Sequence, residues 1–80
     1  MIQVKVVLYA NLGRFHPEGQ GYREFTLKVQ PGSPVGTVLD LLKIPAEEYK
    51  VAFVNNRRRE LTEPLEEGDR VALFPPVGGG

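Results

Sequence analysis

Two stretches near the start of the chain alternate between apolar and polar side chains. In residues 2–9 every second position is apolar, and this period of two predicts a β-strand. Residues 22–29 repeat the alternation and predict a second strand, which we expect to pair antiparallel with the first. Glycine, proline and asparagine between the two indicate that residues 10–21 form a loop.

The apolar pattern changes to that of a helix after residue 33. Apolar side chains recur at i, i+3, i+4 and i+7 on one helical face, at Val35, Val38, Leu39 and Leu42. Ser33 is predicted to be the N-cap, because its hydroxyl can accept a hydrogen bond from a free N–H of the first turn. Pro34 suits the first helical position, and Ile44-Pro45 is predicted to end the helix.

The C-terminal half contains three shorter strand patterns. Residues 50–55 predict a third strand, and Asn56-Arg57-Arg58 predicts a tight turn that leads into a short fourth strand at 59–61. Residues 70–74 predict the last strand. Pro75 ends it, because proline has no N–H to donate to a neighbouring strand.

This order of elements predicts an α+β fold. A single helix that follows a hairpin packs its apolar face on one side of a sheet. The first and last strands are strongly apolar, and we expect them to be central, parallel neighbours joined by a crossover. The expected architecture is a mixed sheet of four to five strands packed on one main helix, formed by residues 1–76, with a flexible C-terminal glycine tail at 77–80.

Length and charge narrow the possible functions. Eighty residues make one small domain with little room for a deep pocket, which favours a carrier or binding module over an enzyme. Ten basic and ten acidic residues give zero net charge, which disfavours nucleic-acid binding through a general electrostatic field. No membrane-spanning run or signal peptide is visible, so we expect a cytoplasmic protein with no membrane contact. Without cysteine, and with only His16 as an imidazole, no metal site is expected.

The most informative chemistry lies at the C-terminus. The chain ends in Phe74-Pro75-Pro76-Val77, followed by Gly78, Gly79 and Gly80. The prolines favour an extended backbone, and glycines have no side chain to obstruct entry into a narrow cleft. When extended, residues 77–80 span roughly 13–14 Å, at about 3.3–3.6 Å per residue. The pattern predicts that the terminal carboxylate is presented to another protein.

Five segments carry a resemblance to a known family: Leu8–Leu12, Gly32–Val35, Val54–Asn56, Leu65–Val71 and Phe74–Gly80. Over its whole length the chain resembles the ubiquitin-like β-grasp sulfur carriers. It looks most like the small subunit of molybdopterin synthase and the thiamine-pathway sulfur carrier. Family members often have alanine before the final Gly-Gly, where this chain has Gly78. The long loop at 10–21 favours the molybdopterin branch.

The resemblance implies a carrier with no catalytic residues of its own and no bound cofactor. A partner related to ubiquitin-activating enzymes would use ATP to attach AMP to the Gly80 carboxylate, and a sulfur donor would displace AMP to leave a thiocarboxylate. Residues 75–79 would enter the partner, with Gly78 and Gly79 threading its channel and Pro75-Pro76-Val77 aiming the tail. The sulfur would then pass to a larger molybdopterin synthase-type subunit or to a thiazole synthase-type acceptor.

Six residues are candidates for a partner-docking surface: Phe74, Ala72, Arg57, Arg58, Glu66 and Glu67. Ala72 and Phe74 are expected on the exposed apolar face of the last strand, although a bulge would move Phe74 to the other side. Arginines at a hairpin tip are more often a solvated turn than a contact. The glutamates are able to complement a basic patch beside the partner's groove and to speed encounter.

Two other hypotheses use the same chain differently. As a ubiquitin-like modifier, it would form an isopeptide bond between Gly80 and lysines of target proteins, which would appear as high-mass conjugates. As a plain protein-interaction β-grasp domain, it would bind partners without its tail. The molybdopterin-like features favour the sulfur carrier.

Overall fold

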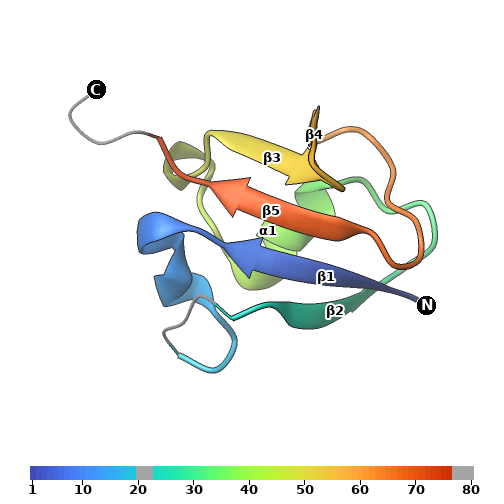
Figure 1. The fold of residues 1–80 in the computed structure, drawn as a ribbon, viewed down its shortest axis with the longest axis horizontal. Coiled ribbons are helices and arrows are strands. Elements are labelled where there is room, and N and C mark those ends of the chain that lie inside the picture. The colour runs from blue at the N-terminus through green and yellow to red at the C-terminus, as the bar shows by residue number, and fades with distance from the viewer. Residues whose placement is uncertain (20–22, 77–80) are drawn as a thin grey trace.

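The computed structural model describes residues 1–19 and 23–76. In these ranges the chain forms a five-stranded sheet with one α-helix and two 3₁₀ helices (Figure 1). The elements in order are β1 (Ile2–Leu8), η1 (Ala10–Phe15), β2 (Phe25–Val29), α1 (Gly36–Leu42), η2 (Ala46–Glu48), β3 (Val51–Val54), β4 (Arg57–Arg59) and β5 (Arg70–Phe74). The predicted α+β class, with a mixed sheet on one main helix, is confirmed.

The sheet has the strand order β2-β1-β5-β3-β4. β1 pairs antiparallel with β2 and parallel with β5, whereas β3 lies antiparallel to both β5 and β4. The first and last strands are therefore central, parallel neighbours, as predicted. Because they are parallel, their carboxyl ends at Leu8 and Phe74 lie at the same end of the sheet (Figure 1).

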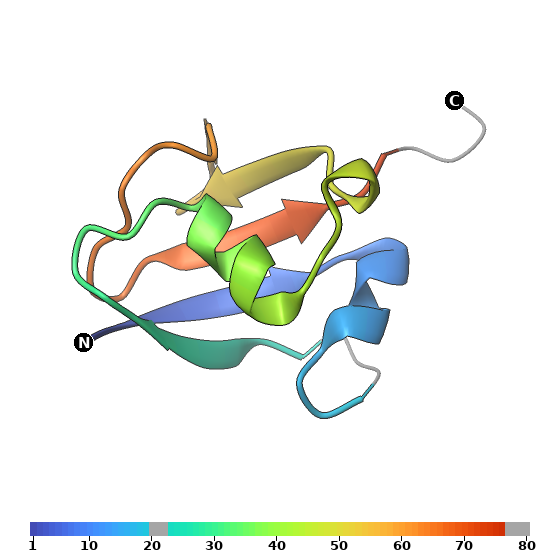
Figure 2. The same ribbon diagram turned by 180° about the vertical axis from the view of Figure 1, so that it is seen from behind.

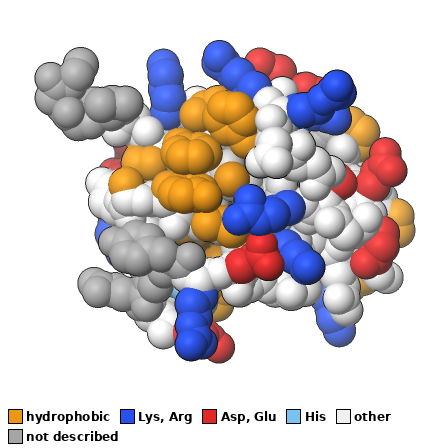
Figure 3. Space-filling model, in the orientation of Figure 1, with side chains coloured by type: hydrophobic (Ala, Val, Ile, Leu, Met, Phe, Trp, Pro, Cys, Tyr) orange, Lys and Arg blue, Asp and Glu red, His pale blue; other side chains and the backbone are white. Residues whose placement is uncertain are grey.

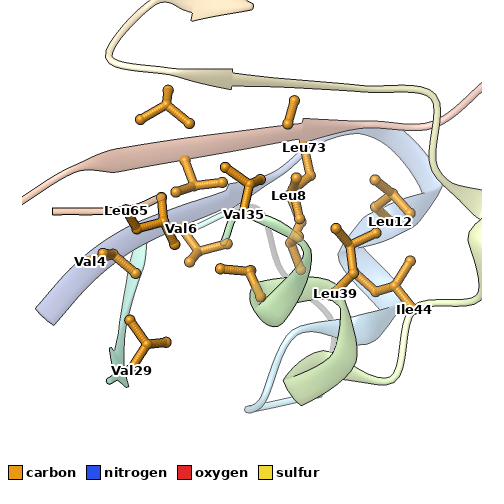
Figure 4. Packing of buried hydrophobic residues seen from close by; sticks show 14 residues of the cluster. Val4, Val6, Leu8, Leu12, Val29, Val35, Leu39, Ile44, Leu65 and Leu73 are labelled. Atoms are coloured by element: carbon orange, nitrogen blue, oxygen red, sulfur yellow. The ribbon is translucent and has the colours of Figure 1, made fainter. Parts of the chain in front are cut away.

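α1 covers one face of the sheet (Figure 2). Val4, Val6 and Leu8 of β1 are fully buried on that side, as their alternation predicts. Figure 4 shows apolar side chains from the helix segment, from β5 and from the connections packed around them: Val35, Leu39, Leu73, Leu12 and Leu65. Burying each such side chain contributes roughly 1.5–3 kcal/mol relative to exposure. This cluster is the core that holds the sheet to the helix.

The helix begins later than the sequence predicts. α1 starts at Gly36 with Val35 in the N-cap position, and no side chain caps its first turn. The predictions of Ser33 as N-cap and Pro34 as first helical residue are therefore wrong. Pro34 instead forms an isolated antiparallel bridge with Pro64.

Backbone carbonyls far along the chain replace the missing cap. The Val35 N–H donates to the Glu63 carbonyl oxygen at 2.9 Å, and the Gly36 N–H donates to the Leu61 carbonyl oxygen at 2.9 Å. The first N–H groups of a helix have no partner inside the helix. Here the connection between β4 and β5 satisfies them, so a serine cap is not needed.

The second hairpin turns one residue earlier than predicted. Asn55 and Asn56 form the turn with positive φ values of 53° and 69°, which a two-residue hairpin turn of type I′ requires and asparagine tolerates. β4 is therefore Arg57–Arg59, not 59–61. The predicted turn at Asn56-Arg57-Arg58 is wrong, and its arginines lie on a strand.

This register places neighbouring arginines on opposite faces of the sheet. Arg58 lies opposite Phe53 and Arg57 lies opposite Val54. Directly paired residues share a face, and Val54 belongs to the core under α1. Arg58 therefore lies on the helix-free face, whereas Arg57 lies on the side of the helix.

The predicted loop at 10–21 contains a 3₁₀ helix. η1 brings Leu12 into the core, where it is fully buried, and the Leu12 N–H donates to the Tyr9 carbonyl oxygen at 3.1 Å. Closing that end of the core gives this segment a fixed shape. β2 begins at Phe25 rather than at residue 22, which lies outside the described residues.

Candidate functional site

The described chain leaves the sheet at the end of β5, between hydrogen bonds from both sides. The Tyr9 N–H donates to the Leu73 carbonyl oxygen at 3.1 Å, and the Lys50 N–H donates to the Phe74 carbonyl oxygen at 2.9 Å. The sheet therefore sets the direction in which the chain departs toward Pro75 and Pro76. Residues 77–80, including the predicted sulfur-bearing terminus, lie outside the described residues, and their roles stay predictions.

Phe74 lies on the helix-free face of the sheet, within an aromatic cluster. Its ring stacks on that of Tyr9, with centroids 4.4 Å apart and planes 5° from parallel. Phe53 meets the same ring edge-on, with centroids 5.6 Å apart. Each such aromatic contact contributes about 0.5–1.5 kcal/mol beyond the area it buries. The structure thus settles the side of Phe74, which the sequence left open.

Ala72 lies on the same face but is buried, with 6% of its surface exposed. In register it lies between Val7 of β1 and Phe53 of β3. The prediction of an exposed Ala72 is wrong, because neighbouring strands cover it with larger side chains. Figure 3 shows apolar side chains gathered in one patch on this face. We call Val7, Tyr9, Phe53, Ala72 and Phe74 the aromatic face.

Basic side chains border the aromatic face. Arg58 lies beside it on β4, and Lys5 and Arg70 are paired on β1 and β5. The Arg70 Nε donates to a Glu24 carboxylate oxygen at 2.7 Å. This hydrogen bond to Glu24, and then one to Tyr9, raises the pKa of the Arg70 guanidinium above its ordinary value. Arg70 therefore links β5 to the start of β2 across β1.

The other predicted docking residues lie elsewhere. Arg57 is on the helix side of β4. Glu66 and Glu67 precede β5, at the end of the sheet opposite the aromatic face, where a Glu67 carboxylate oxygen accepts a hydrogen bond from the Gln3 N–H at 3.1 Å. Of the predicted charged residues, the structure brings only Arg58 together with Phe74 and Ala72.

Tyr9 and Phe53 belong to the site but were not predicted as docking residues. Tyr9 follows the end of β1, so parallel pairing of β1 with β5 brings it beside Phe74. Phe53 occupies the alternate position to Ala52 and Val54, which are buried under the helix. Both placements follow from strand alternation once the strand order is known. The pairing of β1 with β5 was predicted, whereas the pairing of β3 with β5, which brings Phe53 beside Phe74, was not.

Residues 1–19 and 23–76 contain no group of three or more His, Cys, Asp or Glu side chains that could hold a metal ion. His16 is buried, and its Nδ1 accepts a hydrogen bond from the Glu18 N–H at 3.1 Å. The neutral ring therefore carries its proton on Nε2 and donates to the Arg23 carbonyl oxygen at 3.2 Å. This histidine joins the end of η1 to the start of β2.

Within the described ranges, no helix has the length and apolar character needed to cross a membrane.

A mixed sheet packed on one helix, with the last strand central and parallel to the first, defines a ubiquitin-like β-grasp protein. The model of the ThiS family matches residues 15–80. The chain belongs to the ThiS family. A comparison with curated proteins gives no match.

Solved structures agree with this assignment. The chain is similar to SAMP1 from Haloferax volcanii, with a TM-score of 0.74 and 26% identity over 98% of this chain and 99% of that one. It is similar to a putative molybdopterin converting factor, subunit 1, from Pyrococcus furiosus, with a TM-score of 0.71 and 26% identity over 96% and 100%. It is also similar to small archaeal modifier protein 1 from Methanosarcina acetivorans, with a TM-score of 0.65 and 28% identity over 100% of this chain and 98% of that one. The resemblance to ubiquitin-like sulfur carriers is confirmed.

Proposed function

We propose that this chain is a sulfur carrier, activated by adenylation at the Gly80 carboxylate and carrying sulfur there as a thiocarboxylate. The observation that carries the proposal is an aromatic face at the point where the chain of a ThiS-family protein leaves its sheet toward a Gly-Gly-Gly terminus. An apolar surface there lets a partner bind the domain while it takes up the tail.

The proposed chemistry needs activation, because a free α-carboxylate has a pKa of about 3.5 and is a poor electrophile when ionised. In the activating partner, a Gly80 carboxylate oxygen attacks the α-phosphorus of ATP, and pyrophosphate leaves with the electrons of the broken P–O bond. Hydrosulfide, or a donor equivalent to it, then attacks the carbonyl carbon of the acyl adenylate. AMP leaves with the electrons of the C–O bond, and loss of the S–H proton gives the thiocarboxylate.

The chain's own contribution is binding and presentation. Catalysis belongs to an adenylyltransferase related to ubiquitin-activating enzymes, which binds the ATP. If fully extended, residues 77–80 would span roughly 13–14 Å, at about 3.3–3.6 Å per residue. This length allows Gly80 to enter a partner's active site while the aromatic face stays on the partner's surface. Because glycine has no side chain, Gly79 and Gly80 would not obstruct attack on the carbonyl.

We propose molybdopterin biosynthesis as the destination of the sulfur, with a larger molybdopterin synthase-type subunit as acceptor. The likeness to a putative molybdopterin converting factor subunit supports this choice. A thiazole synthase-type acceptor in the thiamine pathway is the alternative, and the ThiS family assignment is compatible with it.

The second candidate function is protein modification. It is favoured by the likeness to proteins named small archaeal modifier protein 1. In that case, the amine of a target lysine would attack the carbonyl carbon of the same acyl adenylate. An isopeptide bond would form, and AMP would leave.

Intact-mass spectrometry tests the proposal. The chain is incubated with ATP, sulfide and the adenylating protein of the same genome. We expect the mass increase of one oxygen replaced by sulfur. Deletion of Gly80 should abolish the increase, whereas deletion of Met1, which is also terminal and 71% exposed, should preserve it. As a positive control, another sulfur carrier is incubated with its own adenylating partner under the same conditions. If that carrier gains sulfur and the mass of the intact chain stays unchanged, sulfur transfer is rejected. Lysine-linked conjugates without a thiocarboxylate would favour modification.

A further inference from the structure

Charge is unevenly distributed over this neutral chain. The register of the strands puts Lys5, Arg58 and Arg70 beside the aromatic face on the helix-free side, and Arg70 is paired with Glu24. Lys28 lies on the same side but opposite Gln3, at the far end of the sheet near Glu67. The glutamates before β5 lie at the far end of the sheet. A partner that approaches the aromatic face therefore meets an apolar surface with a basic border.

A surface cleft of about 230 Å³ opens between the start of β3 and the residues at and after the end of β4, beside this border. Lys50, Val51 and Arg58 line it, and Val51 is paired with Phe74 in the sheet. The cleft therefore adjoins the base of the tail. Its position gives a partner that binds the aromatic face direct access to two cationic side chains.

Two other charged side chains, Arg59 and Glu60, also line the cleft. Arg59 donates to a Glu63 carboxylate oxygen at 2.8 Å. Glu60 lines the cleft next to Tyr49, and burial followed by the charge of Glu60 raises the pKa of that phenol. Among the described residues, Lys50 and Arg58 have no carboxylate within ion-pair distance.

We infer that the cleft between Lys50 and Arg58 receives a carboxylate from the adenylating partner, at the margin of an apolar patch that docks on the aromatic face. The inference rests on the proposed function and adds the chemistry of the partner's surface. An Asp or Glu side chain fits, because the two cleft cations without an ion pair, Lys50 and Arg58, outnumber Glu60, which is the one carboxylate of the cleft, and they lie beside an apolar centre. Pairing at the rim of an interface mainly raises the association rate and fixes the orientation of docking.

Single-stranded nucleic acid is the competing occupant, because cations beside aromatic rings also bind bases and phosphates. The structure favours a protein. Tyr9 and Phe74 stack on each other, so each already has one ring face covered. The zero net charge of the chain further lowers the affinity for a phosphate backbone.

Arg57 and Arg58 form a matched pair for the test. Both are exposed and adjacent on β4, and glutamate at either position changes the net charge equally, but only Arg58 is on the docking face and in the cleft. Association with the purified adenylating partner is measured by stopped-flow fluorescence between about 0.03 and 0.5 M NaCl, where the screening length falls several-fold. Circular dichroism melts confirm that both variants fold.

We expect Arg58→Glu to slow association about three- to tenfold at low salt, and Arg57→Glu to slow it less than about twofold. Lys50→Glu should behave like Arg58→Glu, and all differences should shrink at high salt. Equal effects of Arg57→Glu and Arg58→Glu, or faster association of Arg58→Glu, would overturn the inference. Arg58-dependent binding of a pyrimidine oligonucleotide, with no effect on partner association, would also overturn it.

Failure of the cleft assignment and failure of the proposed function give different results. If the wild-type chain gains sulfur but the two arginine variants associate alike, only the cleft assignment is lost. If the wild-type chain is not charged and does not bind the adenylating partner, the proposed function fails. The assignment of a carboxylate of that partner to the cleft would then be wrong as well.

Discussion

The stack of Tyr9 on Phe74 joins two segments that are far apart in sequence, and a double-mutant cycle can measure its energy. Phe→Ala in a core costs about 3–5 kcal/mol; Phe74 is half-buried, so we expect Phe74→Ala to cost about 2 kcal/mol. Tyr9 is 37% exposed, and Tyr9→Ala should cost about 1 kcal/mol. The stack should contribute about 1 kcal/mol of coupling. The double variant should therefore lose about 2 kcal/mol instead of 3.

Urea unfolding followed by circular dichroism measures these differences, provided that the slopes of free energy against urea agree among variants. Total stability should be about 4–12 kcal/mol for a chain of this length, so all four proteins of the cycle can be compared. Tyr9→Phe is the control, because it keeps the ring and removes the hydroxyl, which helps to raise the pKa of Arg70. It should keep most of the coupling.

A coupling energy below about 0.3 kcal/mol would refute the reasoning, because independent sites add to within about that amount. Loss of the coupling in Tyr9→Phe would assign the energy to the hydroxyl and Arg70 instead of the stacked rings. Both results can be read from unfolding alone, without the partner. The test therefore examines the aromatic face separately from its proposed use.

Three further predictions concern local structure. Gly36→Ala should stabilise the fold by up to about 1 kcal/mol, because alanine has the higher helix propensity. The added Cβ would meet Leu61 at 3.5–3.6 Å, which is an ordinary contact. Lower stability in a thermal melt would contradict this prediction. Gly32→Ala should instead destabilise by about 1–2 kcal/mol, since its φ of 81° is unfavourable for a side chain, and an unchanged melt would argue against that strain. The pKa of Glu63 is lowered from 4.5 by the Glu60 N–H and then by Arg59, so its ionised form favours folding, and this contribution is lost as pH falls below 4.5. Glu63→Gln should therefore reduce the loss of stability at acid pH. If the free energy of unfolding falls equally with pH in both proteins, Glu63 does not contribute to this loss.

Strand alternation was enough to predict the centre of the sheet. β1 and β5 are apolar enough for their alternation to be read locally, and residues 70–74 match the observed strand. Their central, parallel arrangement followed from their shared apolar character and from the long connection between them. These features depend on short-range pattern and on general rules of connection, both of which a sequence contains.

The misplaced boundaries have long-range causes. The start of α1 depends on carbonyl groups of residues 61 and 63, and no local pattern announces that these will face the helix. The hairpin turn depends on Asn55 as well as Asn56 accepting positive φ, and the Asn55 side chain is held by hydrogen bonds to Asp69 and to the Arg70 N–H. A sequence window does not contain these partners.

The candidate site was predicted only in part, because it also depends on residues that are distant in the sequence. Alternation placed Ala72 and Phe74 on one face of the last strand, but the cover over Ala72 comes from β1 and β3. Arg57 and Arg58 were equivalent in the sequence because both were assigned to a turn. A shift of the turn by one residue placed them on opposite faces, which is the difference that the charge-reversal test uses.

The topology explains why the aromatic face, our proposed docking surface, lies where the described chain leaves the sheet. Parallel pairing of β1 with β5 brings the carboxyl ends of both strands to one edge, so the residue after β1 must lie beside the last residue of β5. An aromatic residue at each of these two positions makes Tyr9 stack on Phe74, where the chain continues to Pro75. The contact that holds the end of β5 is therefore also part of the surface that we propose for partner docking. A substitution at Tyr9 should then weaken partner binding and destabilise the end of β5 together, whereas a core substitution under α1 should lower stability without changing the affinity of the folded protein.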